Sequence, residues 1–436
     1  MKFNKWTMGL AAVGVVSLAS AARADEQKSP MSQVATAVNG TTISGNVDFA
    51  ATWRPGTDQG GRSDSYYYGY GANIPKYSYA KNDGFSLNAV DIVVQKAQDE
   101  SLWASGYYVD LTYGADAAGV PLTSNNYYSY GSARSAVSPY GYYSSPVYGF
   151  AVRQAYIALR TPVGNSGIDW KVGVWDTIIG YESSTDALNP NYTRSYGYTI
   201  EPTTHTGILA TYKVNDMVTL SAGVANSIFM PSFTPTATYE SQKAYMGSIA
   251  LTAPDSMGFM KGATLTMGIV NGTDSSYWAN GSGTSLYAGA TIPTPLTALK
   301  VGAAFDYYDH HDSYNYGPYD RNSGDDSAWV AGLYANYLIN DKASFNLRGE
   351  YMSNQGEGPY SYAYPNYRAG NTAEEVTATL QYNLWANVLS RVEFRWDHIE
   401  HGNSFGYSQN NYYSSDYYTA TKENDFMLAL NLIYQF

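Results

Sequence analysis

The sequence predicts an all-β protein: an antiparallel transmembrane β-barrel of about 16 strands, with short turns at one end and long loops at the other. Three observations predict this fold class. Apolar and polar residues alternate in many runs along the chain, long and short connections follow one another in turn, and the final run is an unbroken alternating apolar face.

The strand pattern is clearest in residues 388–398, where apolar residues alternate with Arg391, Glu393, Arg395 and Asp397. Four charges on one strand face cannot lie in an apolar core, so this face must contact water. Comparable runs predict sixteen strands, at residues 41–53, 85–95, 103–113, 150–160, 168–179, 205–214, 217–226, 244–253, 263–271, 285–292, 299–308, 328–339, 343–352, 374–382, 388–398 and 425–436.

Three of these runs, 85–95, 150–160 and 328–339, lose the phase of their alternation part-way along. A β-bulge, which adds one residue to a strand, would explain each slip. The alternation therefore predicts a bulge in each of the three.

The connections between predicted strands alternate in length, which is the arrangement of short periplasmic turns and long external loops in a membrane barrel. The short connections include residues 215–216, 293–298, 340–342 and 383–387. The long ones include residues 54–84, 114–149, 180–204 and 399–424. Both chain ends then fall on the periplasmic side.

Residues 1–24 have the features of a cleaved signal peptide. Lys2 and Lys5 precede a short apolar stretch, and Ala22-Arg23-Ala24 fits the small-x-small cleavage pattern. A transmembrane anchor is the alternative, but the apolar stretch is too short to cross a bilayer. We expect residues 25–40 to be a periplasmic N-terminal segment and residues 41–436 to form the barrel, in the bacterial outer membrane.

The composition excludes several classes of protein. The 436 residues include no cysteine, so disulfides, thiolate metal sites and cysteine nucleophiles are absent. The formal charge of −12 becomes −15 once the three basic residues of the signal peptide are removed, which disfavours nucleic acid as a partner. The abundant glycine and tyrosine, with only 14% charged residues, suit strands, turns and wet aromatic surfaces.

The final strand ends in an alternating apolar face with a terminal aromatic residue. Leu432, Tyr434 and Phe436 at its end are similar to the C-terminal insertion signal of outer-membrane proteins. This predicts the barrel-assembly machinery as a partner, with the lipid bilayer and lipopolysaccharide as surroundings. An ordinary edge strand that happens to end in phenylalanine is the alternative.

The sequence WDTIIGYESSTDALNPNYTRSYGYTIEPTTHTGILAT at residues 175–211 resembles the OmpL-like β-barrel porin family, in particular its members from Verrucomicrobia-type bacteria. NPNYTRS and the following PTTHTG are its most distinctive parts. ISGNVD at residues 43–48, QAYI at 154–157 and LWAN at 384–387 support the resemblance, which extends over essentially the whole mature chain. The resemblance implies a barrel and passive transport, without a known substrate.

Enzyme chemistry has little support. The chain has no Gly-x-Ser-x-Gly elbow and no Walker-type phosphate loop, although a Ser-His-acid triad is recognised by geometry and not by sequence. His310 and His311 stand next to each other on a predicted strand end, where adjacent side chains point to opposite faces and chelate a metal ion poorly. We expect no enzyme activity, no metal and no cofactor.

The architecture predicts a porin, which is a water-filled channel for passive diffusion of small polar solutes and ions. A substrate-biased porin for sugars or cations is one alternative, and a closed surface adhesin or structural barrel is another. Tyrosine clusters in the long loops, such as residues 66–68, 127–128, 142–143, 412–413 and 417–418, either contact sugars or pack against one another. A homotrimer is the oligomer that porins commonly form.

The connection at 180–204 follows the fifth strand, and we predict that it folds into the barrel and narrows the pore. Its candidate constriction residues are Glu182, Asp186, Arg194, Glu201 and His205. Candidate pore-wall residues are Asp48, Asp110, Lys171, Lys300, Asp306, Arg348, Glu350, Arg391, Glu393, Arg395 and Asp397. Arg391 and Arg395 are expected to pair with the loop carboxylates across the lumen. A loop that caps the barrel from outside is the alternative.

Overall fold

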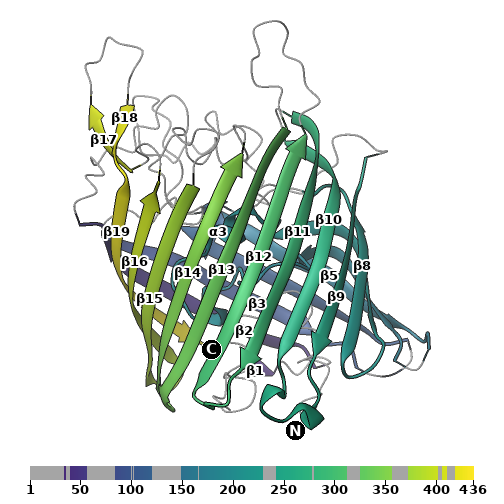
Figure 1. Ribbon diagram of the computed structural model, residues 1–436. Coiled ribbons are helices and arrows are strands. Elements are labelled where there is room, and N and C mark those ends of the chain that lie inside the picture. Colours follow the sequence, from purple (N-terminus) through teal and green to yellow (C-terminus); the bar gives the residue numbers. More distant parts are fainter. Residues whose placement is uncertain are drawn as a thin grey trace, which may run out of the picture.

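The structure is a computed structural model, and it describes residues 34–35, 40–55, 84–99, 101, 103–119, 149–164, 166–228, 242–276, 279–311, 325–355, 372–400, 405–409 and 418–436. One large antiparallel sheet closes on itself as a barrel (Figure 1). Its long strands are β2 (Thr42–Trp53), β3 (Gly84–Lys96), β4 (Ser105–Gly114), β5 (Gly149–Thr161), β6 (Ile168–Asp176), β7 (Thr204–Lys213), β8 (Val218–Ala225), β9 (Ala244–Thr252), β10 (Thr264–Ser276), β11 (Ala279–Pro293), β12 (Leu299–His311), β13 (Asp325–Asn340), β14 (Ala343–Gln355), β15 (Thr372–Trp385), β16 (Val388–Ile399) and β19 (Asn424–Gln435).

Each long strand pairs with its neighbour in the chain, and pairing of β19 with β2 closes the ring. The barrel therefore has 16 long strands, and every run predicted from the sequence corresponds to one of them, so the fold class is confirmed. The two-residue strand β1 (Val34–Ala35) pairs with the start of β2. A separate hairpin of β17 (Phe405–Gln409) and β18 (Tyr418–Lys422) stands at the long-loop end of the barrel in Figure 1.

The short turns are held by asparagine side chains. Between β7 and β8, Asn215 Oδ1 accepts hydrogen bonds from the amides of Met217 (2.8 Å) and Val218 (2.9 Å). Asn340 Oδ1 does the same between β13 and β14, for the amides of Lys342 (2.9 Å) and Ala343 (3.1 Å). An asparagine that bonds the backbone two or three residues later fixes a tight turn, which explains its place in the short connections.

Two of the three predicted bulges are present, and both present polar side chains to the lumen. Asn88 is the extra residue of β3 opposite β2, and Arg153 is the extra residue of β5 opposite β4. In β13 exposed and buried residues alternate without interruption as far as Tyr337, so the irregularity lies near the end of the predicted run. The irregularity of that strand falls at Ile339, beside the turn. Its lumen positions hold Val330 and Tyr334, whose apolar character made the alternation look broken.

Apart from residues 180–204 and the residues of β17 and β18, the long loops lie largely outside the described residues, as do the proposed signal peptide and most of residues 25–40. The tyrosine clusters at residues 66–68, 127–128 and 142–143 lie there too, as do Tyr412, Tyr413 and Tyr417. Within the described part of the chain, no helix is long and apolar enough to cross a membrane.

The register of the final strand separates an exposed apolar outer face from a buried inner face that holds both polar and apolar residues. Leu430 is 53% exposed on the outside, whereas the lumen-facing Arg391 and Glu393 of the neighbouring strand are buried. The chain end joins this arrangement, because Phe436 and Gly45 exchange two main-chain hydrogen bonds of 3.0 Å.

Leu430→Arg should impair assembly of the barrel, because arginine at a midplane position facing lipid costs about 2–4 kcal/mol. When samples are run on a detergent gel without heating, we expect the variant to lack the band of folded protein. Leu430→Met, which keeps an apolar side chain at the same position, is the matched control and should assemble normally. Normal assembly of the arginine variant would show that Leu430 does not face lipid.

Candidate functional site

The connection between β6 and β7, residues 177–203, lies inside the barrel. We call it the inward segment. It contains the short 3-10 helix η3 (Asp186–Leu188) and the helix α3 (Tyr196–Ile200). Figure 1 shows α3 behind the strands of the near wall, part-way along the barrel. Nearly all of the segment's residues up to Glu201 are buried, and its hydrogen bonds reach the walls of several strands.

Local hydrogen bonds give the segment its shape before it meets the wall. The Asn189 side chain accepts from the amide of Ser183 (2.8 Å) and donates to the carbonyl of the same residue (2.7 Å), which closes a compact loop. Ser195 caps α3 by accepting from the amide of Tyr198 at 2.9 Å. Serine is a preferred residue at this position because its hydroxyl satisfies an amide that the helix leaves free.

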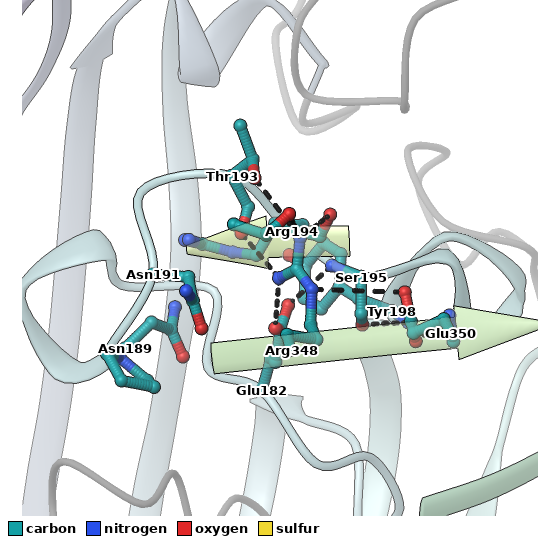
Figure 2. A network of polar contacts seen from close by, with 12 residues as sticks. Glu182, Asn189, Asn191, Thr193, Arg194, Ser195, Tyr198, Arg348 and Glu350 are labelled. Carbon is teal, nitrogen blue, oxygen red and sulfur yellow. Dashed lines mark hydrogen bonds and ion pairs between the residues drawn. The ribbon is translucent and has the colours of Figure 1, made fainter. Parts of the chain in front are cut away.

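Arg348 on β14 is the main cation that holds the segment (Figure 2). Its Nη1 donates to Glu182 Oε1 and to the carbonyl of Thr193, both at 2.7 Å, and its Nη2 donates to the carbonyl of Arg194 at 3.0 Å. On the wall side its Nε donates to Glu375 at 2.6 Å. Arg348 is fully buried, so its charge depends on these partners, and its planar five-donor head suits such a set.

Two wall carboxylates bind main-chain amides of the segment. Glu393 on β16 accepts from the amides of Tyr192 (2.5 Å) and Thr193 (2.8 Å). Glu350 on β14 accepts from the amides of Tyr196 (2.5 Å) and Gly197 (3.3 Å), the first residues of α3. Hydrogen bonds to ionised groups are about twice as strong as neutral ones, so these contacts fix the segment firmly.

Arg391 and Arg395 on β16 reach the segment, but through its carbonyls. Arg391 Nη2 donates to the carbonyls of Asp186 (3.0 Å) and Asn189, and Arg395 Nη1 donates to the carbonyl of Arg194 at 2.6 Å. Both arginines therefore supply hydrogen-bond donors to the main chain of the segment. The reason is that a buried segment with little regular structure has many carbonyls that need donors.

The opposite side of the segment is apolar. Ile178, Ile179 and Ile200 belong to one buried cluster with lumen-facing residues of the facing strands, including Met246 on β9. Tyr181 stacks on Tyr334 of β13 with ring centroids 4.1 Å apart. The segment is thus held by apolar packing against β9–β13 and by charged hydrogen bonds against β14–β16.

The five candidate constriction residues are brought together, and all are buried. Arg194 pairs with Asp186 within the segment, and Glu182 pairs with Arg348. Glu201 is hydrogen-bonded to Asp306 of β12. His205, at the start of β7, lies 3.1 Å from Thr177 Oγ1 through Nε2.

The close approach of α3 to Asp306 needs a glycine in the helix. A Cβ atom at position 197 would lie 2.5 Å from Asp306 Oδ2, so a side chain at Gly197 would displace the carboxyl group. Glycine is otherwise unfavourable within a helix, and its presence here follows from this contact.

The candidate wall residues fall into three groups. The residues that contact the segment are Asp306, Arg348, Glu350, Arg391, Glu393, Arg395 and Asp397, the last by accepting from the Tyr196 hydroxyl at 2.7 Å. Asp48 and Asp110 are buried in wall networks, with Asn88 and Arg153 respectively. Lys171 and Lys300 are half-buried on the lumen side, nearer the short-turn end.

Sequence reasoning missed several residues of the site. Glu375, Thr377 and Thr379 form the lumen face of β15, and Asn346 on β14 donates to the carbonyl of Pro190 at 3.1 Å. Their alternation with outward-facing residues on a predicted strand was a usable signal for the lumen face. Nothing in that pattern showed that they would contact the inward segment.

The C-terminal residues lie on the outer face. Leu432 and Tyr434 are exposed there, while Phe436 is half-buried beside Gly45. Elsewhere, His311 lies 3.2 Å from Asp309, and the side chain of His310 is outside the described residues. Among the residues described, no group of three or more histidines and carboxylates could hold a metal ion.

A family model described as "Putative beta-barrel porin-2, OmpL-like" matches residues 40–436. Comparison with curated proteins gives no match.

Solved structures share the fold at low sequence identity. The anion-selective porin from Comamonas acidovorans is 9% identical, with a TM-score of 0.56, over 91% of this chain and 99% of that one. The outer membrane channel DcaP of Acinetobacter baumannii is 12% identical, with a TM-score of 0.54, over 91% and 97%. OmpF of Salmonella typhi, in complex with daunomycin, is 11% identical, with a TM-score of 0.52, over 91% and 98%.

The contact between Glu201 and Asp306 should make the stability of the folded protein fall as pH rises. Burial, and then the negative charge of Asp306, raise the pKa of Glu201 well above its ordinary value. A raised pKa means that the folded protein favours the protonated form, so this stabilisation is present at low pH and is lost as pH rises through the raised pKa. Above that point the two carboxylates repel each other.

We therefore expect the thermal stability of the barrel to fall as pH rises from the ordinary glutamate pKa of about 4.3 through the raised pKa of Glu201. Glu201→Gln keeps a hydrogen-bonding side chain of similar shape without the second charge, and should flatten this dependence. The measurement is a melting curve in detergent at a series of pH values. The same dependence of melting temperature on pH in both proteins would contradict this role of Glu201.

Proposed function

The chain belongs to the OmpL-like β-barrel porin family, and on that premise we propose that it forms a water-filled channel in the bacterial outer membrane, narrowed by the inward segment. Small polar solutes and ions would cross it by passive diffusion. The observation that carries the proposal is the inward segment, fixed to the wall of a closed barrel of 16 long strands by buried charges. A barrel of this strand number leaves an aqueous channel unless its lumen is filled.

We propose Glu182, Asp186, Arg194, Glu201 and His205 as constriction residues, because all five belong to the segment or its junction with β7. The remaining wall candidates, from Asp48 to Asp397, would line the pore around it. One side of the segment packs against apolar wall residues, and the other is hydrogen-bonded to charged wall residues. Both sets of contacts support a fixed constriction.

Further parts of the proposal rest on the sequence and on the family. We propose that residues 1–24 are a cleaved signal peptide, that residues 25–40 are periplasmic, and that Leu432, Tyr434 and Phe436 are read by the barrel-assembly machinery. Lipopolysaccharide and the bilayer would surround the outer face. A trimer form is known for OmpT of Vibrio cholerae, and we propose the same assembly here. We expect no catalytic activity.

Removal of residues 183–198, replaced by a short glycine-serine link, should raise single-channel conductance clearly and increase the size of solute that passes. The physical reason is that the deletion empties the part of the lumen that the segment occupies. The measurement is planar-bilayer recording with polymers of graded size. Unchanged conductance in a correctly assembled deletion variant would mean that the segment does not narrow the path.

Glu393 offers a matched pair of controls for this experiment. Glu393→Gln keeps one of the two oxygen acceptors that the amides of Tyr192 and Thr193 use, and should disturb the conductance less than Glu393→Ala. Glu393→Ala removes both hydrogen bonds, and should give a current that fluctuates between levels. Absence of any ohmic conductance in the unaltered protein would favour a closed adhesin or structural barrel.

The channel should be weakly cation-selective. Buried carboxylates outnumber buried guanidinium groups in the lumen, and an excess of one sign concentrates counter-ions. Arg194→Ala removes the arginine that pairs with Asp186 and should strengthen the preference for cations. The double variant Arg194→Ala with Asp186→Asn should return this preference to the level of the unaltered protein. Reversal potentials under a salt gradient measure the effect, which should fade at high salt. A preference for anions in the unaltered protein would contradict the prediction.

A further inference from the structure

Three side chains form a row on the lumen wall made by strands β4, β5 and β6. Tyr108 on β4 lies directly opposite Tyr156 on β5, with ring centroids 5.3 Å apart and planes 11° apart. Lys171 on β6 places its Nζ 4.8 Å from the centre of the Tyr156 ring. Tyr156 therefore lies between an aromatic ring and a cation.

The alternation of each strand directs this row into the lumen. Ile157 and Val172 are exposed on the outer face, so their neighbours Tyr156 and Lys171 face inward. Asp110, two residues after Tyr108 on the same face, is buried against Arg153. All three residues of the row are half-buried, in contrast to the fully buried contacts around the segment.

A glycine makes room for the lysine. The residue directly opposite Tyr156 on β6 is Gly173, which has a φ of +137°. A Cβ atom there would lie 2.3 Å from the carbonyl oxygen of Ala155, so no side chain fits beside Tyr156 at this level. The ammonium group of Lys171 is instead placed over the ring, where the negative face of the aromatic system attracts it.

For the part of the chain that the structure describes, neither phenol hydroxyl nor Lys171 Nζ has a hydrogen bond or an ion pair. The neighbouring charges are already engaged. Arg153 pairs with Asp110 and, at 3.3 Å, with Asp176, and Gln154 donates to Asp176 at 3.0 Å.

We infer that Tyr108, Tyr156 and Lys171 form a binding subsite for the carboxylate group of small organic acids that pass through the channel. The inference rests on the proposed function, because it requires solutes to reach the lumen. An ammonium group and two phenol hydroxyls are hydrogen-bond donors, and a carboxylate is a ligand made only of acceptors. Bonds between charged partners are the strongest of this kind.

The site does not suit a cation. Binding a cation would need accessible carboxylate oxygens, but the oxygens of Asp110 and Asp176 without a partner are both buried from solvent. Arg153 pairs with both of these carboxylates. Lys171 therefore supplies the accessible charge, and it is positive.

Gluconate and sorbitol distinguish a carboxylate site from a general sugar site, because they share a six-carbon chain of hydroxyl groups and differ in the acid. Gluconate added to one side of a bilayer should reduce the potassium chloride current in a saturable way, whereas sorbitol should not. Lys171→Met keeps the length of the side chain and should raise the half-blocking concentration about tenfold, the effect of losing one charged hydrogen bond.

Three further variants locate the effect. Tyr108→Phe and Tyr156→Phe keep the ring stack and remove one hydroxyl each, so each should weaken gluconate block by a smaller factor. Lys300→Met removes the same charge from β12, six strands away in the ring, and should leave the block unchanged. Equal weakening by both lysine variants would mean that gluconate responds only to the overall charge of the lumen.

Other outcomes would also overturn the inference. Equal block by sorbitol and gluconate, insensitive to Lys171→Met, would assign the row to hydroxyl groups. Steady potassium chloride conductance without any effect of gluconate would refute the subsite and leave the channel intact. Absence of conductance in every variant would refute the proposed function itself.

Discussion

The structure depends on one constraint: a chain segment placed inside a barrel must find partners for its main-chain amides and carbonyls. Only 8 residues of residues 177–203 lie in helices η3 and α3, so most of the segment cannot satisfy these groups by itself. An unpaired buried amide or carbonyl costs about 1–3 kcal/mol. The wall supplies the missing partners, with Arg348, Arg391 and Arg395 as donors and Glu350 and Glu393 as acceptors.

This constraint changes how the lumen charges are understood. A porin wall rich in arginine and glutamate suggests an open field across the pore, with each side chain free in water. Here the same side chains are buried, and their hydrogen bonds go to the backbone of the segment. Removing one partner of such a buried contact costs about 3–5 kcal/mol, because the other charge remains without compensation. These charges therefore mainly hold the segment in place. A solute meets only the electric field of the charge that these contacts leave uncompensated.

The sequence predicted the barrel more completely than the site. Alternation and connection length depend on neighbouring residues, so the strands could be predicted, and so could the inner position of Arg391 and Glu393. The bulges at Asn88 and Arg153 were visible as slips of phase, whereas the apolar lumen positions Val330 and Tyr334 imitated one. Apolar residues inside a barrel are unexpected until an apolar face of the segment is known to pack against them.

The contacts of the segment could not be predicted, because they join residues far apart in the chain. Arg348 and Glu182 are separated by 166 residues, and no local pattern encodes their pairing. The NPNYTRS sequence did show that the region is distinctive, and the structure gives the physical reason. Asn191 donates to Thr379 at 2.7 Å, and the backbone of Pro190, Tyr192, Thr193 and Arg194 contacts charged or amide side chains of the wall.

The same logic explains why the β4–β6 wall differs from the rest of the ring. Where the segment packs, the polar side chains of the wall bind its main-chain amides and carbonyls. Little of their hydrogen-bonding capacity is left for a solute. On the β4–β6 wall, the hydroxyls of Tyr108 and Tyr156 and the ammonium group of Lys171 keep that capacity. We propose that one part of the lumen holds the constriction in place and that another part recognises what passes. A substitution among the wall residues that hold the segment should alter pore size with little effect on solute preference. A substitution in the row should alter solute preference with little effect on pore size.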